Sequence, residues 1–180
     1  MIIGIAGCGG IGSNVAYHLV RAGVKNFKFG DFDKIEESNL NRQFFFKEQV
    51  GLYKSETLAK NLLLINPSIQ IENEIIRFER DNIKEFFKDC DIVVEAFDKK
   101  EYKSLLVEEL LPLGKKIVSA SGIGGSETKN IKIRKFGKNL TVVGDFETDT
   151  DIYKTYSHKV GAVACMMAEK VLEIGGYFEK

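Results

Sequence analysis

A glycine-rich turn between an apolar run and an amphipathic segment constrains the fold of this chain more than any other feature. Residues 2–6 are continuously apolar, as in a strand covered on both faces, and residues 13–21 carry apolar residues at helical spacing. Between them stands the sequence G-C-G-G-I-G. Glycines permit a tight turn and let the backbone approach a phosphate, while the helix N-terminus directs free N–H groups at the anion. The pattern favours a phosphate-binding turn at Gly7, Gly9, Gly10 and Gly12 over a turn that is merely tight.

A second apolar run, residues 24–30, follows the first helix and ends in Asp31. This order predicts a β-α-β crossover in which the aspartate comes at the carboxyl end of the second strand. An acidic residue about twenty positions after the glycine turn is placed to bind a ribose hydroxyl. We therefore expect Asp31 to complete a nucleotide site.

The rest of the chain alternates between helical and extended patterns. Ser55 is the predicted N-cap of the second helix. The sequence predicts one α/β domain over residues 1–180, with a Rossmann-like three-layer fold and a mostly parallel sheet extended by an antiparallel hairpin. The remaining expected elements are helices within 57–65, 77–88, 102–113 and 161–174, strands at 68–76, 90–96 and 115–120, and a hairpin from 131–136 and 140–143.

Composition and charge exclude several classes of function. The 180 residues are 44% hydrophobic, and 26 basic side chains balance 26 acidic ones, so no net field points to nucleic acid or to an anionic membrane. No run approaches the roughly 20 apolar residues that span a bilayer. Three widely separated cysteines predict neither a disulfide framework nor structural zinc. We expect a cytoplasmic protein.

Polar residues follow two of the predicted strands and can converge beside the glycine turn. They are Asn39, Arg42, Gln43 and Lys54 after the second strand, and Asp98 after the fourth. Arginine and lysine can hold a polyphosphate, and an aspartate can hold the accompanying magnesium. Each also has a plainer explanation: Arg42 as a surface ion pair, Lys54 as a solvated helix start, and Asp98 as a helix cap. The acidic stretch 144–158 fits a solvated loop better than a metal site.

Taken together, these residues resemble the ThiF-like adenylyltransferases, relatives of the ubiquitin-activating enzymes that activate small sulfur-carrier proteins. The resemblance runs from residue 2 to about residue 175. It is carried by the glycine turn, Asp31-Phe32-Asp33, Ser38-Asn39-Leu40-Asn41-Arg42-Gln43, Val50-Gly51-x-x-Lys54, Ile65-Asn66-Pro67, Glu95-Ala96-Phe97-Asp98 and Lys159-Val160-Gly161. The N-L-N-R-Q element followed by G-x-x-K is its most specific part, and the whole resembles the short form associated with thiamine synthesis.

The resemblance implies an activity, a partner and a role for each site residue. The C-terminal glycine carboxylate of a ubiquitin-like carrier ending in Gly-Gly would attack the α-phosphate of ATP and release pyrophosphate. Asp31 and Asp33 would belong to the nucleotide site, with Asp31 on the ribose. Asn39, Arg42, Gln43 and Lys54 would contact the phosphates, and Asp98 would position Mg²⁺. Arg42, Lys54 and Asp98 would be the catalytic residues, and the protein would pair as a homodimer, with apolar faces at 140–143 and 163–172.

The chain departs from the family pattern at several points. Lys99 replaces the asparagine that often follows the aspartate, the paired zinc cysteines are absent, and the sequence starts directly at the first strand, without the preceding helix whose arginine reaches a partner subunit. Two alternatives are a NAD(P)-dependent oxidoreductase and a catalytically silent nucleotide-binding module. The few candidates for hydride transfer, such as Tyr156 with Lys159, are more simply loop and helix-start residues. We also expect activation without a cysteine nucleophile, because residues 144–158 contain none and Cys165 falls in an apolar helix, where thiols are inert.

Overall fold

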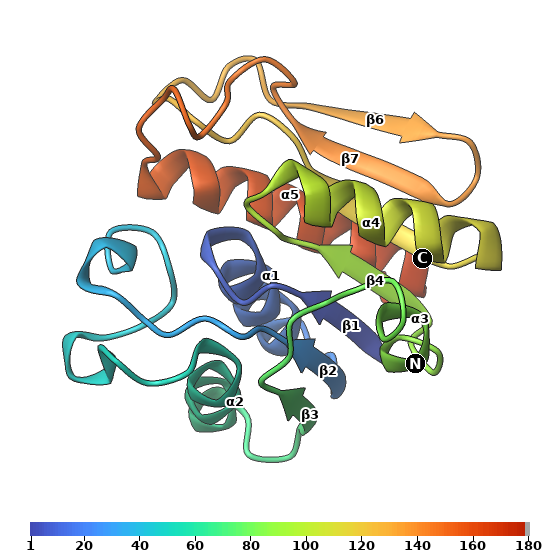
Figure 1. Cartoon of the computed structure of the whole chain (residues 1–180), viewed down its shortest axis with the longest axis horizontal. Helices are drawn as coiled ribbons and strands as arrows, with labels where there is room; N and C mark the ends of the chain where they lie inside the picture. The colour runs from blue at the N-terminus through green and yellow to red at the C-terminus, as the bar shows by residue number, and fades with distance from the viewer. Residues whose placement is uncertain (179–180) are drawn as a thin grey trace.

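The computed structural model describes residues 1–178; the last two residues of the predicted domain, 179–180, lie outside the described part. Strands and helices alternate through most of the chain (Figure 1). The strands are β1 (Ile3–Ala6), β2 (Asn26–Gly30), β3 (Gln70–Glu74), β4 (Ile92–Glu95), β5 (Lys116–Ala120), β6 (Lys132–Phe136) and β7 (Leu140–Gly144). The helices are α1 (Gly10–Arg21), α2 (Lys54–Ile65), α3 (Ile83–Phe86), α4 (Lys100–Leu110) and α5 (Ser157–Gly175), with short 3₁₀ turns η1 (Glu37–Asn39), η2 (Lys47–Gln49) and η3 (Leu111–Leu113).

The strands form one sheet in the order β3-β2-β1-β4-β5-β7-β6. All neighbours pair in parallel except β6 and β7, which form the antiparallel hairpin. The predicted fold class is therefore confirmed. After β1 the chain forms β2 and β3 on one side of that strand, and later it forms β4 and β5 on the other side. In open α/β sheets, ligands bind beyond the carboxyl ends of the strands where the order reverses, which here is the edge between β1 and β4.

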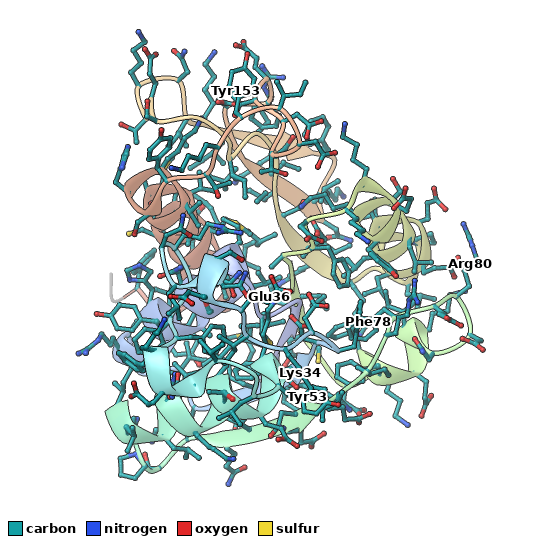
Figure 2. The ribbon with its side chains drawn as sticks, turned by 60° about the vertical axis from the view of Figure 1, so that its left-hand side comes forward. Lys34, Glu36, Tyr53, Phe78, Arg80 and Tyr153 are labelled. Atoms are coloured by element: carbon teal, nitrogen blue, oxygen red, sulfur yellow. The ribbon has the colours of Figure 1, made fainter. Side chains whose placement is uncertain are left out.

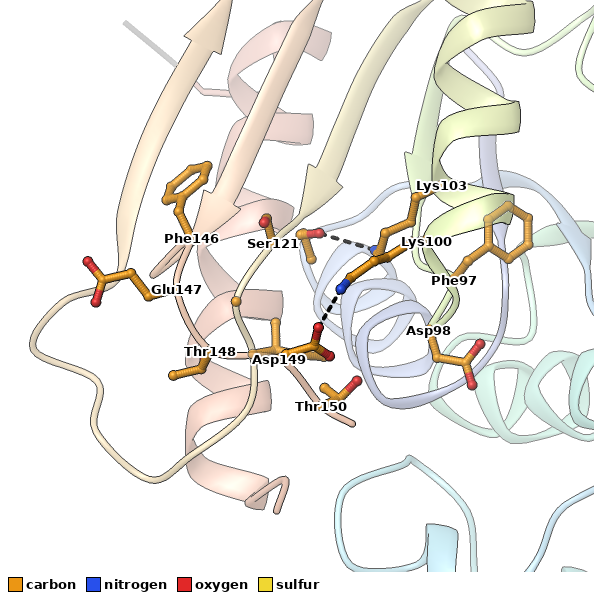
Figure 3. A pocket seen from close by; sticks show the side chains of 13 residues that line it. Phe97, Asp98, Lys100, Lys103, Ser121, Phe146, Glu147, Thr148, Asp149 and Thr150 are labelled. Carbon is orange, nitrogen blue, oxygen red and sulfur yellow. Dashed lines mark hydrogen bonds and ion pairs between the residues drawn. The ribbon is translucent and has the colours of Figure 1, made fainter. Parts of the chain in front are cut away.

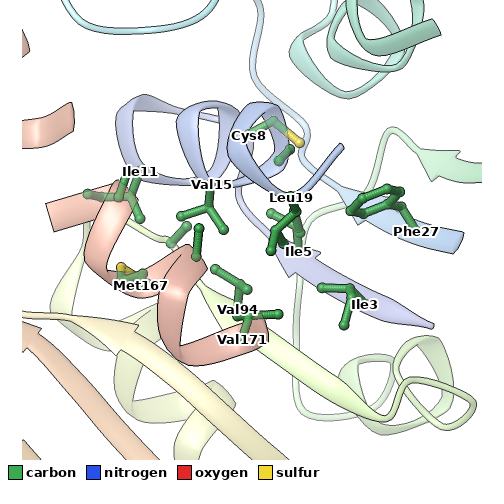
Figure 4. Packing of buried hydrophobic residues seen from close by; sticks show 14 of the residues in the cluster. Ile3, Ile5, Cys8, Ile11, Val15, Leu19, Phe27, Val94, Met167 and Val171 are labelled. Atoms are coloured by element: carbon green, nitrogen blue, oxygen red, sulfur yellow. The ribbon is translucent and has the colours of Figure 1, made fainter. Parts of the chain in front are cut away.

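Helices cover both faces of the sheet because the central strands are apolar on both faces. Ile3 and Ile5 of β1 face α1 and α5, where Leu19 and Met167 are fully buried (Figure 4). Val93 of β4 points the other way, into a second cluster beneath α3 and α4. This alternation along each strand places two cores on opposite sides of one sheet, as the three-layer prediction requires.

The apolar residues from which we predicted a dimer face are partly covered within the chain. Val143 of β7 and Val163, Met167 and Val171 of α5 are buried, whereas Leu140, Val142, Met166 and Leu172 are only partly buried. The homodimer stays a prediction. None of the helices in the described part of the chain is long and apolar enough to cross a membrane.

Candidate functional site

The glycine turn joins β1 to α1 at the carboxyl edge of the sheet. Gly7 has φ +91°, which side chains rarely adopt, and a Cβ there would lie 3.0 Å from the carbonyl oxygen of Ala96 after β4. A Cβ on Gly12 would lie 1.8 Å from the carbonyl oxygen of Gly7. Gly12 therefore lets α1 pack on the turn and does not line the cavity. No side chain caps the N-terminus of α1, so its first N–H groups can bind an anion.

Asp31 follows β2 directly and is nearly buried beside the turn. Its two carboxylate oxygens accept hydrogen bonds from the backbone N–H groups of Cys8 (2.6 Å) and Asp33 (2.7 Å). Burial raises the pKa of Asp31, and the nearby Lys54 ammonium and these two N–H groups offset part of the rise. The carboxylate thus has a fixed orientation at the cavity wall, as a ribose-binding acid needs.

Lys54 begins α2 and points back to the same edge. Its Nζ is 3.0 Å from Asp33 Oδ2, its N–H donates to the carbonyl of Asp33, and its side chain is only 9% exposed. Lys54 is therefore not the solvated helix start of the plainer explanation. The predicted N-cap was wrong: Tyr53 holds that position, and Ser55 lies inside α2, where its hydroxyl donates to the carbonyl of Asp31 at 3.3 Å.

Two contacts fix the segment between Asp31 and α2. Lys34 and Tyr53, near its two ends, form a β-bridge with each other, and the Lys34 ammonium lies 4.9 Å from the centre of the Tyr53 ring (Figure 2). The Asn14 side chain of α1 donates to the carbonyl of Arg42 at 2.9 Å. The first contact closes the base of the segment, and the second ties the N-L-N-R-Q element to α1.

Within this element, Asn39 shapes the turn and Arg42 and Gln43 reach the cavity. The Asn39 side chain accepts from the N–H of Glu36, and its carbonyl accepts from the N–H groups of Arg42 and Gln43. Asn39 itself does not line the cavity. Gln43 Oε1 is buried without a hydrogen-bond partner in the described part of the chain. Buried polar atoms are nearly always satisfied, so this oxygen marks a place for a ligand or a water.

Asp98 lies past the carboxyl end of β4 and is exposed to the cavity. The N-cap of α4 is Lys99, and no side chain caps that helix, so the cap explanation of Asp98 was wrong. Glu95, which is fully buried, holds the loop before Asp98 in place. Its carboxylate accepts a hydrogen bond from the N–H of Phe97 at 2.8 Å and pairs with Lys103 Nζ at 3.0 Å. Lys103 was not among the predicted site residues. The sequence feature that could have identified Glu95 is a glutamate at the end of an otherwise apolar strand.

The side chains converge on a cavity of about 730 Å³, which is within the usual range of small-molecule sites. Charged groups and aromatic rings both line it. A neighbouring cavity of about 260 Å³ opens beyond Asp98 (Figure 3). Predicted residues that line the larger cavity are Gly7, Gly9, Gly10, Asp31, Asp33, Arg42, Gln43, Lys54 and Asp98, and the aromatic wall consists of Phe32, Phe78, Phe97 and Tyr102.

The acidic loop after β7 differs from the solvated loop that we expected. Asp145 is buried, and its Oδ2 lies 2.6 Å from Nζ of Lys159, which is 1% exposed. Lys159 also donates to the carbonyl of Gly124 and to the Thr148 hydroxyl. Burial acts to raise the pKa of Asp145, but hydrogen bonds from Lys159, Thr148 and Glu147 outweigh it and lower the pKa to about 2. Local sequence gave no signal for this buried pair.

The described residues contain no cluster of three or more His, Cys, Asp or Glu side chains that could hold a metal ion. The cysteines divide into two groups. Cys8 and Cys90 are buried, and burial raises both thiol pKa values, that of Cys90 to about 12. Cys165 is exposed, so the expectation of a thiol enclosed in an apolar helix was wrong.

These features define an α/β protein of Rossmann-like fold with a cavity at the carboxyl edge of its sheet. The ThiF family model matches residues 1–175, and the chain belongs to that family. Among curated relatives, the adenylyltransferase and sulfurtransferase UBA4 of Candida glabrata is 36% identical over 67% of this chain and 28% of its own length. The sulfur carrier protein adenylyltransferase of Thermus thermophilus is 34% identical over 63% of this chain and 42% of its own length. The chain thus spans less than half the length of these relatives.

Solved structures of low sequence identity share the fold. The tRNA N6-threonylcarbamoyladenosine dehydratase TcdA of Escherichia coli, in complex with ATP, has a TM-score of 0.84 at 22% identity over 97% of this chain and 86% of its own. E. coli MccB, solved with AMPCPP and MccA, has a TM-score of 0.75 at 23% identity, covering 98% of this chain and 56% of its own.

Proposed function

We propose that this protein is an ATP-dependent adenylyltransferase that activates the C-terminal glycine carboxylate of a small ubiquitin-like sulfur carrier. The observation that carries the proposal is the convergence of the glycine turn, Asp31, Arg42, Lys54 and Asp98 on one cavity. Two relatives support the choice of reaction: one is named an adenylyltransferase and sulfurtransferase, and the other a sulfur carrier protein adenylyltransferase. The chain's likeness to the short thiamine-synthesis form of the family favours a carrier from that pathway.

The residues that line the cavity offer contacts to each part of ATP: the purine, the ribose and the triphosphate. The aromatic wall, which includes Phe32 and Tyr102, offers flat faces to a purine, and the Asp31 carboxylate can accept from ribose hydroxyls. The N-terminus of α1 and the cations Arg42 and Lys54 suit the triphosphate, and the unpaired Gln43 Oε1 marks a polar contact that a ligand or bridging water can complete. A hydroxyl or water can satisfy an acceptor of this kind.

The chemistry needs alignment and charge neutralisation more than proton transfer. A carboxylate oxygen of the carrier attacks the α-phosphorus, the bond to the β-bridging oxygen breaks, and pyrophosphate leaves. The side chains of Arg42 and Lys54 would stabilise the charge on the phosphates, and the glycine turn would fix the nucleotide for in-line attack. The Lys54 ammonium would either leave Asp33 for the phosphate or bind both, because one ammonium group can donate hydrogen bonds to two acceptors.

Asp98 would hold Mg²⁺ at the edge of β4. A single carboxylate fits this ion, because Mg²⁺ is commonly bound by one or two carboxylates together with substrate phosphates and waters. When bound, the ion would neutralise phosphate charge. Asp98 faces both cavities, so it is placed where the two substrates would meet.

The test of the proposed function is carrier-dependent exchange of labelled pyrophosphate into ATP. We expect exchange with a ubiquitin-like sulfur carrier ending in Gly-Gly and none with the same carrier lacking its last two residues. Absence of exchange with every such carrier would leave the silent nucleotide-binding module as the better assignment.

Calorimetry with ATP–Mg²⁺ and with NAD separates the oxidoreductase alternative. We expect binding of ATP only, because Arg42 and Lys54 suit a triphosphate. The predicted hydride-transfer pair does not line the larger cavity: Lys159 is buried against Asp145, and Tyr156 is 40% exposed elsewhere. Tighter binding of NAD would reverse the order of the two hypotheses. Light scattering would test the proposed homodimer.

A further inference from the structure

An ion pair marks the boundary between the two cavities. Lys100, the first residue of α4, pairs with Asp149 of the loop that follows β7, and the two residues are 49 positions apart in the chain. Both side chains line the nucleotide cavity and the smaller cavity beside it. Figure 3 shows Lys100 reaching across to Asp149, with Asp98 nearby. The pair therefore lies where the two cavities meet.

The pair is easily separated. The Lys100 side chain is 81% exposed and that of Asp149 is 25% exposed, and exposed ion pairs contribute little to stability. Hydrogen bonding with Asp149 raises the pKa of Lys100, and the same bond lowers the pKa of Asp149, so both are charged at neutral pH. Asp149 has a further partner in its own loop, the N–H of Asp151 at 3.0 Å. The carboxylate can therefore release the lysine and keep one hydrogen bond.

The other lysine of the smaller cavity is already committed. Lys103 Nζ pairs with the buried Glu95 and donates to the carbonyl of Ala120 at 3.1 Å. Releasing it would leave a buried carboxylate uncompensated, which is costly. Lys100 is thus the cation at this junction that a second carboxylate can take over without a buried charge being left behind.

Resting on the proposed function, we propose that Lys100 receives the C-terminal carboxylate of the substrate on its way to the α-phosphate, and that Asp149 occupies this position when the substrate is absent. Asp149 then acts as an internal mimic of the substrate carboxylate. One carboxylate replaces another as the partner of Lys100, so the lysine stays paired throughout. Lys100 is a substrate-specificity residue in this scheme, and Asp149 is a weak internal competitor.

The two partners are expected to have opposite effects on substrate use. The assay is pyrophosphate exchange driven by a synthetic decapeptide that ends in Gly-Gly with a free carboxylate. Lys100→Gln should raise the KM for the peptide roughly three- to tenfold and leave the KM for ATP unchanged, since a rim charge guides association. Asp149→Asn should lower the peptide KM by up to about fivefold, the most that an exposed pair withholds. A purely structural pair predicts higher KM in both variants, and that result would overturn the inference.

Two controls accompany this assay. Lys88→Gln removes a lysine from another exposed ion pair, that with Glu85, and should leave both KM values unchanged. A peptide with an amidated C-terminus should drive no exchange in any variant. If the wild-type protein shows no exchange with any carrier or peptide, the proposed function has failed and the inference needs a separate measurement.

That measurement is an NMR titration of ¹³C-lysine-labelled protein with N-acetylglycylglycine, which reports binding without catalysis. The signal that disappears in Lys100→Gln identifies Lys100. We expect it to shift with the free acid, to shift at lower concentration in Asp149→Asn, and to stay in place with the amide. A Lys100 signal that does not respond to the acid would overturn the inference, whatever the outcome of the exchange assay.

Discussion

The two sides of the larger cavity are built in different ways. The side formed by residues 7–54 holds two buried charged groups: Asp31, which accepts two backbone N–H groups, and Lys54, which is 9% exposed. The side formed by Asp98, Lys100 and the loop after β7 presents exposed side chains, with one buried ion pair, Lys159–Asp145, beneath them. The first side is preformed for a small ligand. The second can adjust to a larger one, because exposed side chains rearrange at little cost.

The largest expected effect is the loss of activity when the Asp98 carboxylate is removed from the exposed side of the cavity. Asp98→Ala should lower carrier-dependent pyrophosphate exchange by about a thousandfold, since this group would position the metal and the two anions. The thermal unfolding midpoint should not change, because Asp98 is exposed. Asp98→Asn, which keeps the size and removes the charge, should be nearly as inactive. Exchange within a few-fold of wild type in either variant would remove Asp98 from the mechanism.

The buried pair under the exposed side should matter for stability. Lys159→Met leaves the Asp145 carboxylate buried without its cation, and we expect the free energy of unfolding to fall by about 3 kcal/mol. Chemical denaturation measures this. Lys170→Met is the matched control on the same helix, with exposed glutamate partners, and should change stability by less than about 0.5 kcal/mol. Adding Asp145→Asn to Lys159→Met should restore part of the loss; no recovery would mean that the lysine acts through packing alone.

On the preformed side, we expect binding to suffer more than stability. Lys54→Met should raise the Kd for ATP roughly ten- to hundredfold, the range for loss of a charged hydrogen bond to phosphate. Lys60→Met, at an exposed position of α2, is the control and should bind ATP like the wild type. Calorimetry measures the Kd for ATP in both variants. Equal ATP affinity in the two would return Lys54 to a structural role as the partner of Asp33.

The two sides should also respond to pH with opposite signs. Asp145 has a pKa of about 2 in the folded protein against an ordinary 3.8, so its ionised form contributes about 2 kcal/mol to the free energy of unfolding. This contribution is complete above pH 4 and is lost as the pH falls toward 2. The pKa of Asp31 is raised, so its ionisation opposes folding and stability is gained as pH falls through that pKa.

Unfolding free energies measured between pH 2 and 6 test this contrast. Asp145→Asn should flatten the loss of stability at low pH, and Asp31→Asn should steepen it. The same change of slope in both variants would contradict the opposite shifts.

The smallest expected effect concerns the cysteines. The triple Cys8→Ala, Cys90→Ala, Cys165→Ser variant should keep carrier-dependent exchange within about twofold when assayed well below its unfolding temperature, with some loss of stability from the two buried positions. Cys165 is the thiol to watch, because it is exposed. A carrier conjugate detected by mass spectrometry and lost in Cys165→Ser would show a covalent step that the proposed mechanism lacks.

The sequence alone determined the parts of this protein that depend on neighbouring residues. The glycine turn between β1 and α1, the aspartates that follow β2 and β4, and the β6–β7 hairpin were all predicted, and the structure has them in place. Local periodicity fixes helices and strands, and parallel strands bring their carboxyl ends to one edge. The convergence of Asp31, Lys54 and Asp98 on one cavity follows from these facts.

Only the tertiary structure decided which charges are buried and with whom they pair. Lys159 looked like an ordinary helix-start residue and Asp145 like part of a solvated loop, yet they form a buried pair across 14 residues. Lys100 and Asp149 meet across 49 residues, and Cys165 of an apolar helix is left uncovered. A side chain's burial depends on what packs against it from distant parts of the chain. Propensity and periodicity describe only the residues beside it, so they contain no record of these pairings.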